Sequence, residues 1–214
     1  MFFNDRRQAG EKLADQLTPY RGRQPLILAV PRGGAAVAEP VWEALGGELD
    51  LIITRKIGAP YQPELAIGAV TGDGFVMLNE KIVSRLSVSG DYINKTAGEE
   101  QDEIRRRLRL YRGSRPLPVV DKRLVILVDD GVATGYTLLA ALRSVQEKKP
   151  SRLVLAVPVG PPDTFTMLQS EADDMVYLEA PDHFAAVGQF YRKFDQVSDA
   201  EVSAILKRAW QEER

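Results

Sequence analysis

Two adjacent carboxylates, Asp129 and Asp130, follow a short apolar run and precede a turn rich in glycine and threonine. The apolar run 124–128 has the length and the sharp boundaries of a buried strand. Paired carboxylates at a strand end can accept hydrogen bonds from neighbouring hydroxyl groups. The turn offers backbone N–H groups and the hydroxyls of Thr134 and Thr137 to a phosphate at a helix N-terminus. The pattern predicts a ribose 5-phosphate site rather than a general anion site.

The composition of the chain excludes several other kinds of chemistry. With 214 residues, of which 44% are hydrophobic and 27% charged, the chain can form one substantial globular core. A formal net charge of −2 gives no global field that would attract nucleic acid or an anionic membrane. The chain has no cysteine, which excludes disulfides and thiolate chemistry. No apolar segment is long enough for a membrane span, so we expect a cytoplasmic protein without nucleic-acid or membrane partners.

The elements that must position these groups alternate along the chain. Asn4 or Asp5 can cap a first helix, and residues 79–112 have a mostly helical pattern. Strands separated by helix-length segments imply right-handed βαβ units, hence a doubly wound α/β fold with a mostly parallel five-stranded sheet. The other expected segments are strand 26–30, helix 35–45, strand 49–54, strand 124–128, helix 136–148, strand 153–157, helix 162–170 and strand 175–178.

One pair of short apolar segments has the pattern of a hairpin. Residues 65–70 and 75–78 flank the sequence Thr71-Gly72-Asp73-Gly74. Glycines suit the turn positions of a hairpin that need a positive φ. We therefore expect an antiparallel flap beside the parallel sheet.

Two further expected strand ends carry cationic and glycine residues. The residues 31–34, Pro-Arg-Gly-Gly, follow the first strand, and Arg55 and Lys56 follow the second. Because ligands of parallel sheets bind at the carboxyl ends of the strands, these loops and the two aspartates should converge. Arg32 and its cationic partners would then suit a second, diphosphate-like anion, and the two glycines would allow its close approach. Each piece alone would more often be an ordinary turn or a solvated strand end.

The run 124–137 resembles the motif that binds phosphoribosyl diphosphate (PRPP) in the type I phosphoribosyltransferases. The likeness extends to Asp5-Arg6 and to residues 31–34, 55–60, 64–69 and 184–191, which look like a stand-alone bacterial and archaeal branch of predicted phosphoribosyltransferases. The resemblance implies a flexible flap after the second strand and a small hood that covers the second substrate. It implies one domain, 1–214, with the flap and a helical insertion at about 64–115 and the hood at about 180–214 together with the N-terminal helix.

The resemblance also implies roles for matching residues. Asp129 and Asp130 would hold the ribose 2′- and 3′-hydroxyls and, through water, Mg²⁺. Arg32 would lie in a diphosphate loop, where this fold often has a non-proline cis peptide, and Lys56 would bind the departing diphosphate. The residues implied to bind substrate are Gly33, Gly34, Arg55, Gly131, Ala133, Thr134, Gly135, Tyr136 and Thr137, with Phe184, Phe190 and Tyr191 in the hood.

The residue at one position of the turn narrows the choice of acceptor base. Where 6-oxopurine transferases usually have an aspartate, this chain has Ala133, which looks more like the adenine and uracil branches. A 6-oxopurine acceptor is therefore disfavoured. The turn supplies no general base, which leaves Glu64, Asp182 and His183 as candidates. For His183, the only histidine, a structural or incidental role is the stronger alternative.

The aromatic residues of the segment 182–195 allow two interpretations. Phe184, Phe190 and Tyr191 could stack on a planar base. Alternatively, Phe190 and Phe194 are four residues apart and could form one core-facing stripe of a helix. Both interpretations stay open at the level of sequence.

The sequence thus predicts a Mg²⁺-dependent phosphoribosyltransferase of nucleotide metabolism. It would transfer ribose 5-phosphate from PRPP to a small nitrogenous base and release diphosphate. The main alternative is a regulator of the same fold that binds PRPP without turnover. A phosphoacceptor receiver is disfavoured because receivers place their acidic pair after the first strand. The base, the pathway and the oligomeric state are not identified, although a homodimer is compatible with the sequence.

Overall fold

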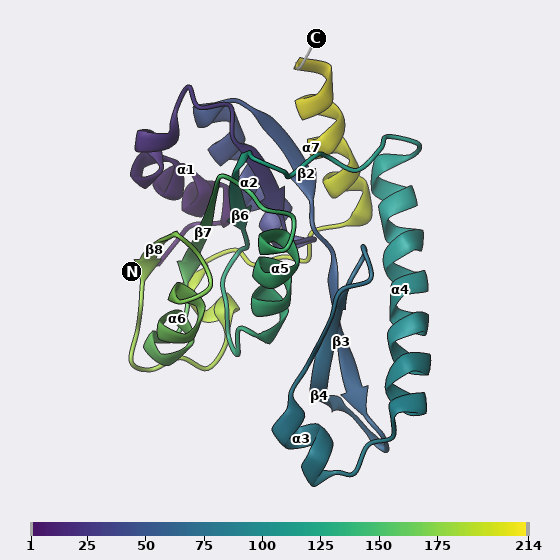
Figure 1. The fold of residues 1–214 in the computed structure, drawn as a ribbon. Coiled ribbons are helices and arrows are strands. Elements are labelled where there is room, and N and C mark those ends of the chain that lie inside the picture. The colour runs from purple at the N-terminus through teal and green to yellow at the C-terminus, as the bar shows by residue number, and fades with distance from the viewer. Residues whose placement is uncertain (1, 213–214) are drawn as a thin grey trace.

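A parallel five-stranded sheet forms the centre of the molecule in the computed structural model, which describes residues 2–212 (Figure 1). The strand order is β2-β1-β6-β7-β8, and every neighbouring pair is parallel. This confirms the doubly wound α/β fold and places the strand before the two aspartates in the middle of the sheet. The strands are β1 (Leu26–Ala29), β2 (Glu48–Leu51), β6 (Leu124–Val128), β7 (Arg152–Val159) and β8 (Asp174–Glu179).

Helices cover both faces of this sheet. Alternate residues of β6 belong to two separate cores: Ile126 packs with Val37 of α2, and Leu127 packs with Leu138 of α5. Because β6 is buried on both faces, its sequence is an unbroken apolar run. One face carries α1 (Arg6–Gln16), α2 (Gly33–Leu45) and α7 (Asp199–Glu212), and the other carries α5 (Tyr136–Gln146) and α6 (Pro162–Gln169).

A second, antiparallel sheet projects from the body beside a long helix (Figure 1). We call this unit, residues 54–112, the flap. Its strand order is β3-β4-β5. Its elements are β3 (Thr54–Ala59), β4 (Gln62–Thr71), β5 (Val76–Leu78), α3 (Glu80–Arg85) and α4 (Gly90–Arg112).

The expected strand 49–54 is wrong in one respect that matters for the site. The parallel strand β2 ends at Leu51, and the chain starts a new strand at Thr54. Arg55 and Lys56 therefore lie inside β3 of the flap rather than in a loop at a strand end. The residues between the strands, Ile52 and Ile53, are both buried, so no polar residue marks the break.

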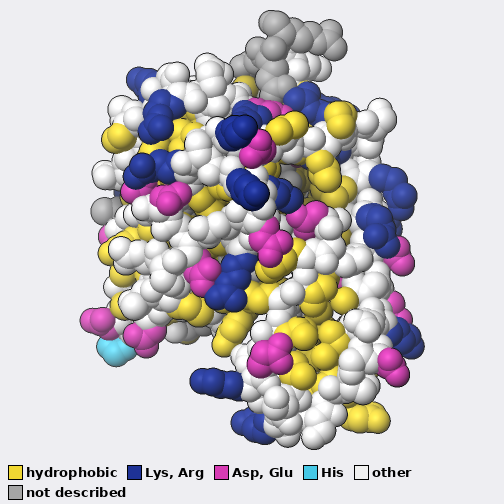
Figure 2. Space-filling view, viewed as in Figure 1, with side chains coloured by type: hydrophobic (Ala, Val, Ile, Leu, Met, Phe, Trp, Pro, Cys, Tyr) yellow, Lys and Arg dark blue, Asp and Glu magenta, His cyan; other side chains and the backbone are white. Residues whose placement is uncertain are grey.

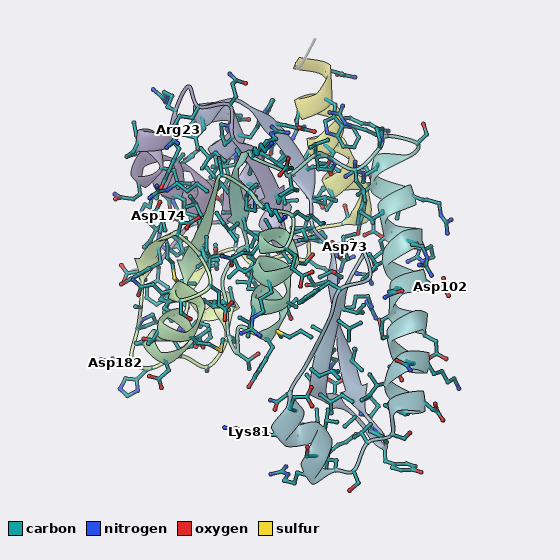
Figure 3. The ribbon with its side chains drawn as sticks, viewed as in Figure 1. Arg23, Asp73, Lys81, Asp102, Asp174 and Asp182 are labelled. Atoms are coloured by element: carbon teal, nitrogen blue, oxygen red, sulfur yellow. The ribbon has the colours of Figure 1, made fainter. Side chains whose placement is uncertain are left out.

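The turn between β4 and β5 faces the body instead of the solvent. Of its two glycines only Gly74 has a positive φ, at 96°. Asp73 accepts a hydrogen bond of 2.9 Å from Ser144 and pairs with Lys148 at 2.5 Å, both on α5 or just beyond its end (Figure 3). The free end of the flap is the opposite turn, where Tyr61 is fully exposed.

The chain end before α1 is paired with a distant segment near the C-terminus. Asp5 caps α1 by accepting a hydrogen bond of 2.9 Å from the Gln8 amide. Just before it, Phe3 forms a parallel bridge with Tyr191. We call residues 180–195 the hood; it contains the short 3₁₀ helix η2 (Val187–Phe190), and another, η1 (Thr18–Tyr20), follows α1.

The expected single domain included residues 1 and 213–214, which lie outside the described residues. Its expected hood of about 180–214 extends to α7, which in the structure packs against α2, α4 and β2. Within residues 2–212, no helix combines the length and the apolarity that a bilayer span requires.

Candidate functional site

The two aspartates and the loop after β1 lie side by side. In the sheet register Ala29 pairs with Val128, so both strands end at the same level. The loop then turns through a cis peptide between Pro31 and Arg32. The expected convergence of these two loops is confirmed.

Two glycines allow the loops to approach each other closely. A Cβ added at Gly33 would lie 1.9 Å from Oδ2 of Asp130. A Cβ at Gly34 would lie 3.1 Å from Oδ1 of Asp129. A residue larger than glycine at position 33 would displace the carboxylate. We call Gly33, Gly34, Asp129, Asp130 and the turn 131–137 the cradle.

The turn of the cradle is hydrogen-bonded to α6 and β7. Val132 donates a backbone hydrogen bond of 2.9 Å to Val159, and the Thr164 hydroxyl donates one of 2.7 Å to the Ala133 carbonyl. Gly135, with φ 79°, is the N-cap of α5. The backbone N–H groups that begin α5 are thus available to an anion. The exposed side chains of the turn are Ala133, Thr134, Tyr136 and Thr137.

The surroundings of the two cradle carboxylates disfavour their charged forms. Burial, together with the neighbouring Asp130 carboxylate, raises the pKa of Asp129 well above its usual range. Burial also raises the pKa of Asp130, although the Arg6 guanidinium opposes this shift. A cation beside these carboxylates would stabilise their charged forms.

The carboxylates of the cradle are the candidate ligands for a metal ion. Among residues 2–212, no group of three or more His, Cys, Asp or Glu side chains is placed to hold one. Two adjacent carboxylates nevertheless fit Mg²⁺, which usually keeps several waters and is bound through one or two carboxylates plus substrate phosphates. The residues therefore fit a magnesium ion that arrives with a phosphorylated substrate.

Of Arg55 and Lys56, the structure brings Lys56 toward the cradle. A cavity of about 320 Å³ lies between the flap and the turn and is lined by Lys56, Glu64 and Tyr136, among others. In the space-filling view the flap is a separate lobe, set off from the body by a notch (Figure 2). Lys56 pairs with Glu64 at 2.7 Å across the edge of this cavity.

The Arg55 side chain contacts α4 instead of the cradle. Successive side chains of a strand alternate between its two faces, and Arg55 pairs with Glu100 on α4. The Arg32 side chain pairs with Asp199 at the start of α7, and its Nη1 lies 3.7 Å from that carboxylate. Asp199 in addition accepts a hydrogen bond of 2.6 Å from Tyr111.

The hood aromatics are mostly covered. Phe190 and Tyr191 are only 7% and 6% exposed, and they pack with Phe3 in a small core. Phe184, which stacks on Phe190 at 5.4 Å, is half-buried and has more ring surface to offer a base. The helical stripe of Phe190 and Phe194 is wrong, because the only helix there ends at Phe190.

The three candidate general bases do not contact the carboxylates of the cradle. Glu64 is highly exposed and paired with Lys56. Asp182 and His183 are exposed, and Figure 3 shows Asp182 at the edge of the body away from the flap. Proton transfer by any of the three stays a prediction.

Sequence reasoning missed the contact of Arg6 with the cradle. Its Nε donates a hydrogen bond of 2.7 Å to Oδ2 of Asp130, which is 124 positions away. The local signal was the Asp5 cap, which places Arg6 in the first helical turn. No local pattern could show which partner that side chain meets.

Comparison with known proteins gives the family. The model of the phosphoribosyl transferase domain matches residues 4–195. Two Mycobacterium tuberculosis proteins, from strains CDC 1551 and H37Rv, each named "Putative phosphoribosyl transferase", are 40% identical over 207 residues. These matches cover 97% of this chain but 47% of each relative, so the chain spans about half of their length.

Solved structures agree with the fold. The crystal structure of TT1426 from Thermus thermophilus is 43% identical, with a TM-score of 0.84 and coverage of 97% of this chain and 99% of that chain. The AQ2163 protein from Aquifex aeolicus is 10% identical, with a TM-score of 0.50 over 94% of this chain and 85% of that chain, and shows a similar fold alone. The family match includes every residue of the cradle. The chain therefore belongs to the phosphoribosyl transferase domain family.

Proposed function

We propose that the protein transfers ribose 5-phosphate from PRPP to a small nitrogenous base and releases diphosphate. The observation that carries this proposal is the cradle, in which two carboxylates, a glycine loop and a helix N-terminus adjoin. The carboxylates suit vicinal hydroxyls, and the helix N-terminus suits the 5-phosphate. We expect a cytoplasmic enzyme of nucleotide metabolism.

Each group of the cradle has a role in the proposed reaction. The bond between C1 of the ribose and the diphosphate oxygen breaks, and that oxygen keeps the electron pair. The base nitrogen forms the new bond to C1 and loses its proton to a basic group or to water. Asp129 and Asp130 hold the hydroxyls of the ribose, while the N–H groups of 133–137 hold its phosphate. Holding the ribose by its hydroxyls and by its phosphate lowers the entropic cost of reaching the transition state.

Charge on the leaving group must also be neutralised. Lys56 lines the cavity between the flap and the turn, and it is paired with Glu64. Asp129 and Asp130 would hold Mg²⁺ through water. When bound, Mg²⁺ would supply electrostatic stabilisation of the departing diphosphate.

Calorimetry with PRPP and Mg²⁺ tests the donor site. We expect the wild-type chain to bind PRPP. Asp130→Asn or Gly33→Ala should weaken PRPP binding by about tenfold or more, since the loss of residues that only orient a ligand-binding group already costs that much. The matched control is Gly98→Ala on α4, where an added Cβ meets nothing within 4 Å. Absence of binding to the wild-type chain would contradict the proposal.

A regulator that binds PRPP without turnover is the second candidate. It is favoured by the placement of the candidate bases, none of which contacts the cradle carboxylates. Release of diphosphate should be measured with adenine, uracil and hypoxanthine as acceptors. Release that depends on a base supports the enzyme, with hypoxanthine expected to be the poorest of the three because position 133 is alanine. Binding without release would support the regulator.

A further inference from the structure

Two neighbouring arginines at the start of α1 have opposite environments. The Arg6 side chain is only 12% exposed and turns inward to Asp130. The Arg7 side chain is 55% exposed and pairs with Glu43 at 2.8 Å and with Glu11 at 3.3 Å. One arginine is thus built into the cradle, and the other provides a natural control.

Three contacts fix the Arg6 guanidinium. Its Nε donates to Oδ2 of Asp130, and its Nη1 donates a hydrogen bond of 2.7 Å to the Asp195 carbonyl. The charged group also lies 3.8 Å from the centre of the Phe194 ring. A planar guanidinium that is hydrogen-bonded at its edge and stacked on its face has a defined orientation. Lysine could not reproduce this set of contacts.

The hood holds the other side of the same aspartate. The Tyr191 hydroxyl donates a hydrogen bond of 2.5 Å to the Asp130 carbonyl. The backbone around it is joined to the chain before α1, since Phe3 donates to Phe190 and accepts from Arg192, both at 2.8 Å. The hood and the start of α1 therefore form one unit that contacts Asp130 twice.

This unit is also fixed relative to the glycine loop. Helix α1 lies so close to α2 that a Cβ added at Gly10 would be 2.2 Å from the Val37 carbonyl oxygen. Helix α2 begins at Gly33, and a Cβ there would lie 2.9 Å from Nε of Arg6. The position of Arg6 therefore follows from the same packing that forms the cradle.

We propose that Arg6 is a positioning residue for the donor, which deepens the proposed function and rests on it. By holding Oδ2 of Asp130, Arg6 leaves Oδ1 as the oxygen that accepts a hydrogen bond from the ribose. Arg6 also links the hood to the donor site, so the two parts keep one relative placement. Residues that orient a ligand-binding group in this way are commonly worth about 10- to 100-fold in affinity or activity.

The test is calorimetry of PRPP with Mg²⁺ on four chains: wild type, Arg6→Met, Arg6→Lys and Arg7→Met. Each is measured at a temperature where circular dichroism shows it to be folded. We expect PRPP affinity to fall about tenfold or more in Arg6→Met, to fall less in Arg6→Lys, and to stay at the wild-type value in Arg7→Met. In a turnover assay the KM for PRPP should rise more than kcat falls.

The outcomes separate this proposal from the one it rests on. If the wild-type chain binds PRPP and Arg6→Met binds it equally well, the role of Arg6 is refuted while the proposed function stands. A lower melting temperature with unchanged affinity would mean a merely structural role and would also refute it. If Arg6→Met does not fold, the PRPP affinity of Arg6→Lys tests the proposal instead, because that variant keeps the positive charge. No binding by the wild-type chain would overturn both proposals.

Discussion

Asp73, in the turn between β4 and β5, is one of the residues through which the flap contacts the body. Its carboxylate accepts hydrogen bonds from Thr71 in the same turn and from Ser144, and it pairs with Lys148. Burial raises the pKa of Asp73, yet the hydrogen bonds from Lys148, Thr71 and Ser144 outweigh it and lower the pKa to about 2. The charged form is therefore more stable in the folded chain than in the unfolded chain.

This shift predicts a loss of stability in acid. The unfolded pKa of an aspartate is about 3.9, so the contribution of Asp73 is complete above that value and is lost as the pH falls through about 2. We expect Asp73→Asn to lower the free energy of unfolding at pH 7 by about 1–3 kcal/mol. Urea unfolding between pH 7 and pH 2 measures both effects.

The matched control for Asp73 is Asp15→Asn, at an exposed position of α1. This variant should keep the pH dependence of the wild-type chain. If Asp73→Asn shows the same slope below pH 4 as the wild-type chain, the three contacts do not stabilise the carboxylate as the structure indicates.

At the scale of elements, one buried ion pair joins the end of α4 to the edge of the parallel sheet. Arg112, the last residue of α4, pairs with Asp50 on β2, and their side chains are 2% and 0% exposed. Arg112 also donates to the Pro116 carbonyl beyond the helix. Burial raises the pKa of Asp50 to about 6, although the Arg112 charge lowers it, so the pair is ionised at neutral pH.

Breaking this pair from its two sides should have unequal costs. Arg112→Met leaves a buried carboxylate without its cation, and we expect a loss of about 3–5 kcal/mol at pH 8. Asp50→Asn leaves the Arg112 guanidinium buried, but an amide oxygen at position 50 and the Pro116 carbonyl can still accept its hydrogen bonds, so this variant should cost less. Urea unfolding of both variants at pH 8 makes the comparison. Equal losses would show that the two buried groups depend on each other to the same degree and would contradict this expectation.

Lowering the pH should distinguish the two variants further. In Arg112→Met the cation that lowers the pKa of Asp50 is absent, so the folded chain favours the protonated carboxyl more strongly. An aspartate with a raised folded pKa is most favourable below its unfolded pKa and loses stability as the pH rises. The deficit of Arg112→Met should therefore shrink between pH 8 and pH 5, whereas Asp50→Asn should show no such recovery.

At the scale of the whole molecule, the proposed donor would touch the body, the flap and the hood together. A ligand that binds only the folded chain stabilises it by about 2.7 kcal/mol at one hundred times its Kd. For a chain of this length we expect PRPP with Mg²⁺ at that concentration to raise the Tm by about 5–10 °C. Thermal unfolding with and without the ligand measures the shift.

Two comparisons make this measurement specific. Asp130→Asn should lose about half of the shift or more at the same concentration, since a tenfold weaker affinity lowers the stabilisation from about 2.7 to about 1.4 kcal/mol. Ribose 5-phosphate should give a smaller shift than PRPP, because it lacks the diphosphate. Equal shifts for both ligands would indicate that the diphosphate contributes nothing to binding.

The flap shows where local patterns stop being informative. Its hairpin was predictable from the turn 71–74, which has glycines and an aspartate between two apolar segments. The break between β2 and β3 was not, because the buried residues Ile52 and Ile53 continue the apolar pattern of the strand. Successive side chains of β3 point to opposite faces of the strand, so Lys56 lies toward the site and Arg55 does not.

The parallel sheet and the chemical character of the cradle could be predicted from the order of residues along the chain. Those features depend on neighbours along the chain: an apolar run buried on both faces, two carboxylates at its end and a glycine at the start of α5. The pairing of Arg6 with Asp130, and of Arg55 with Glu100 instead of the site, became visible only in the folded chain. The partner of a charged side chain is set by how distant elements pack, and the residues beside it in the sequence carry no signal of that packing.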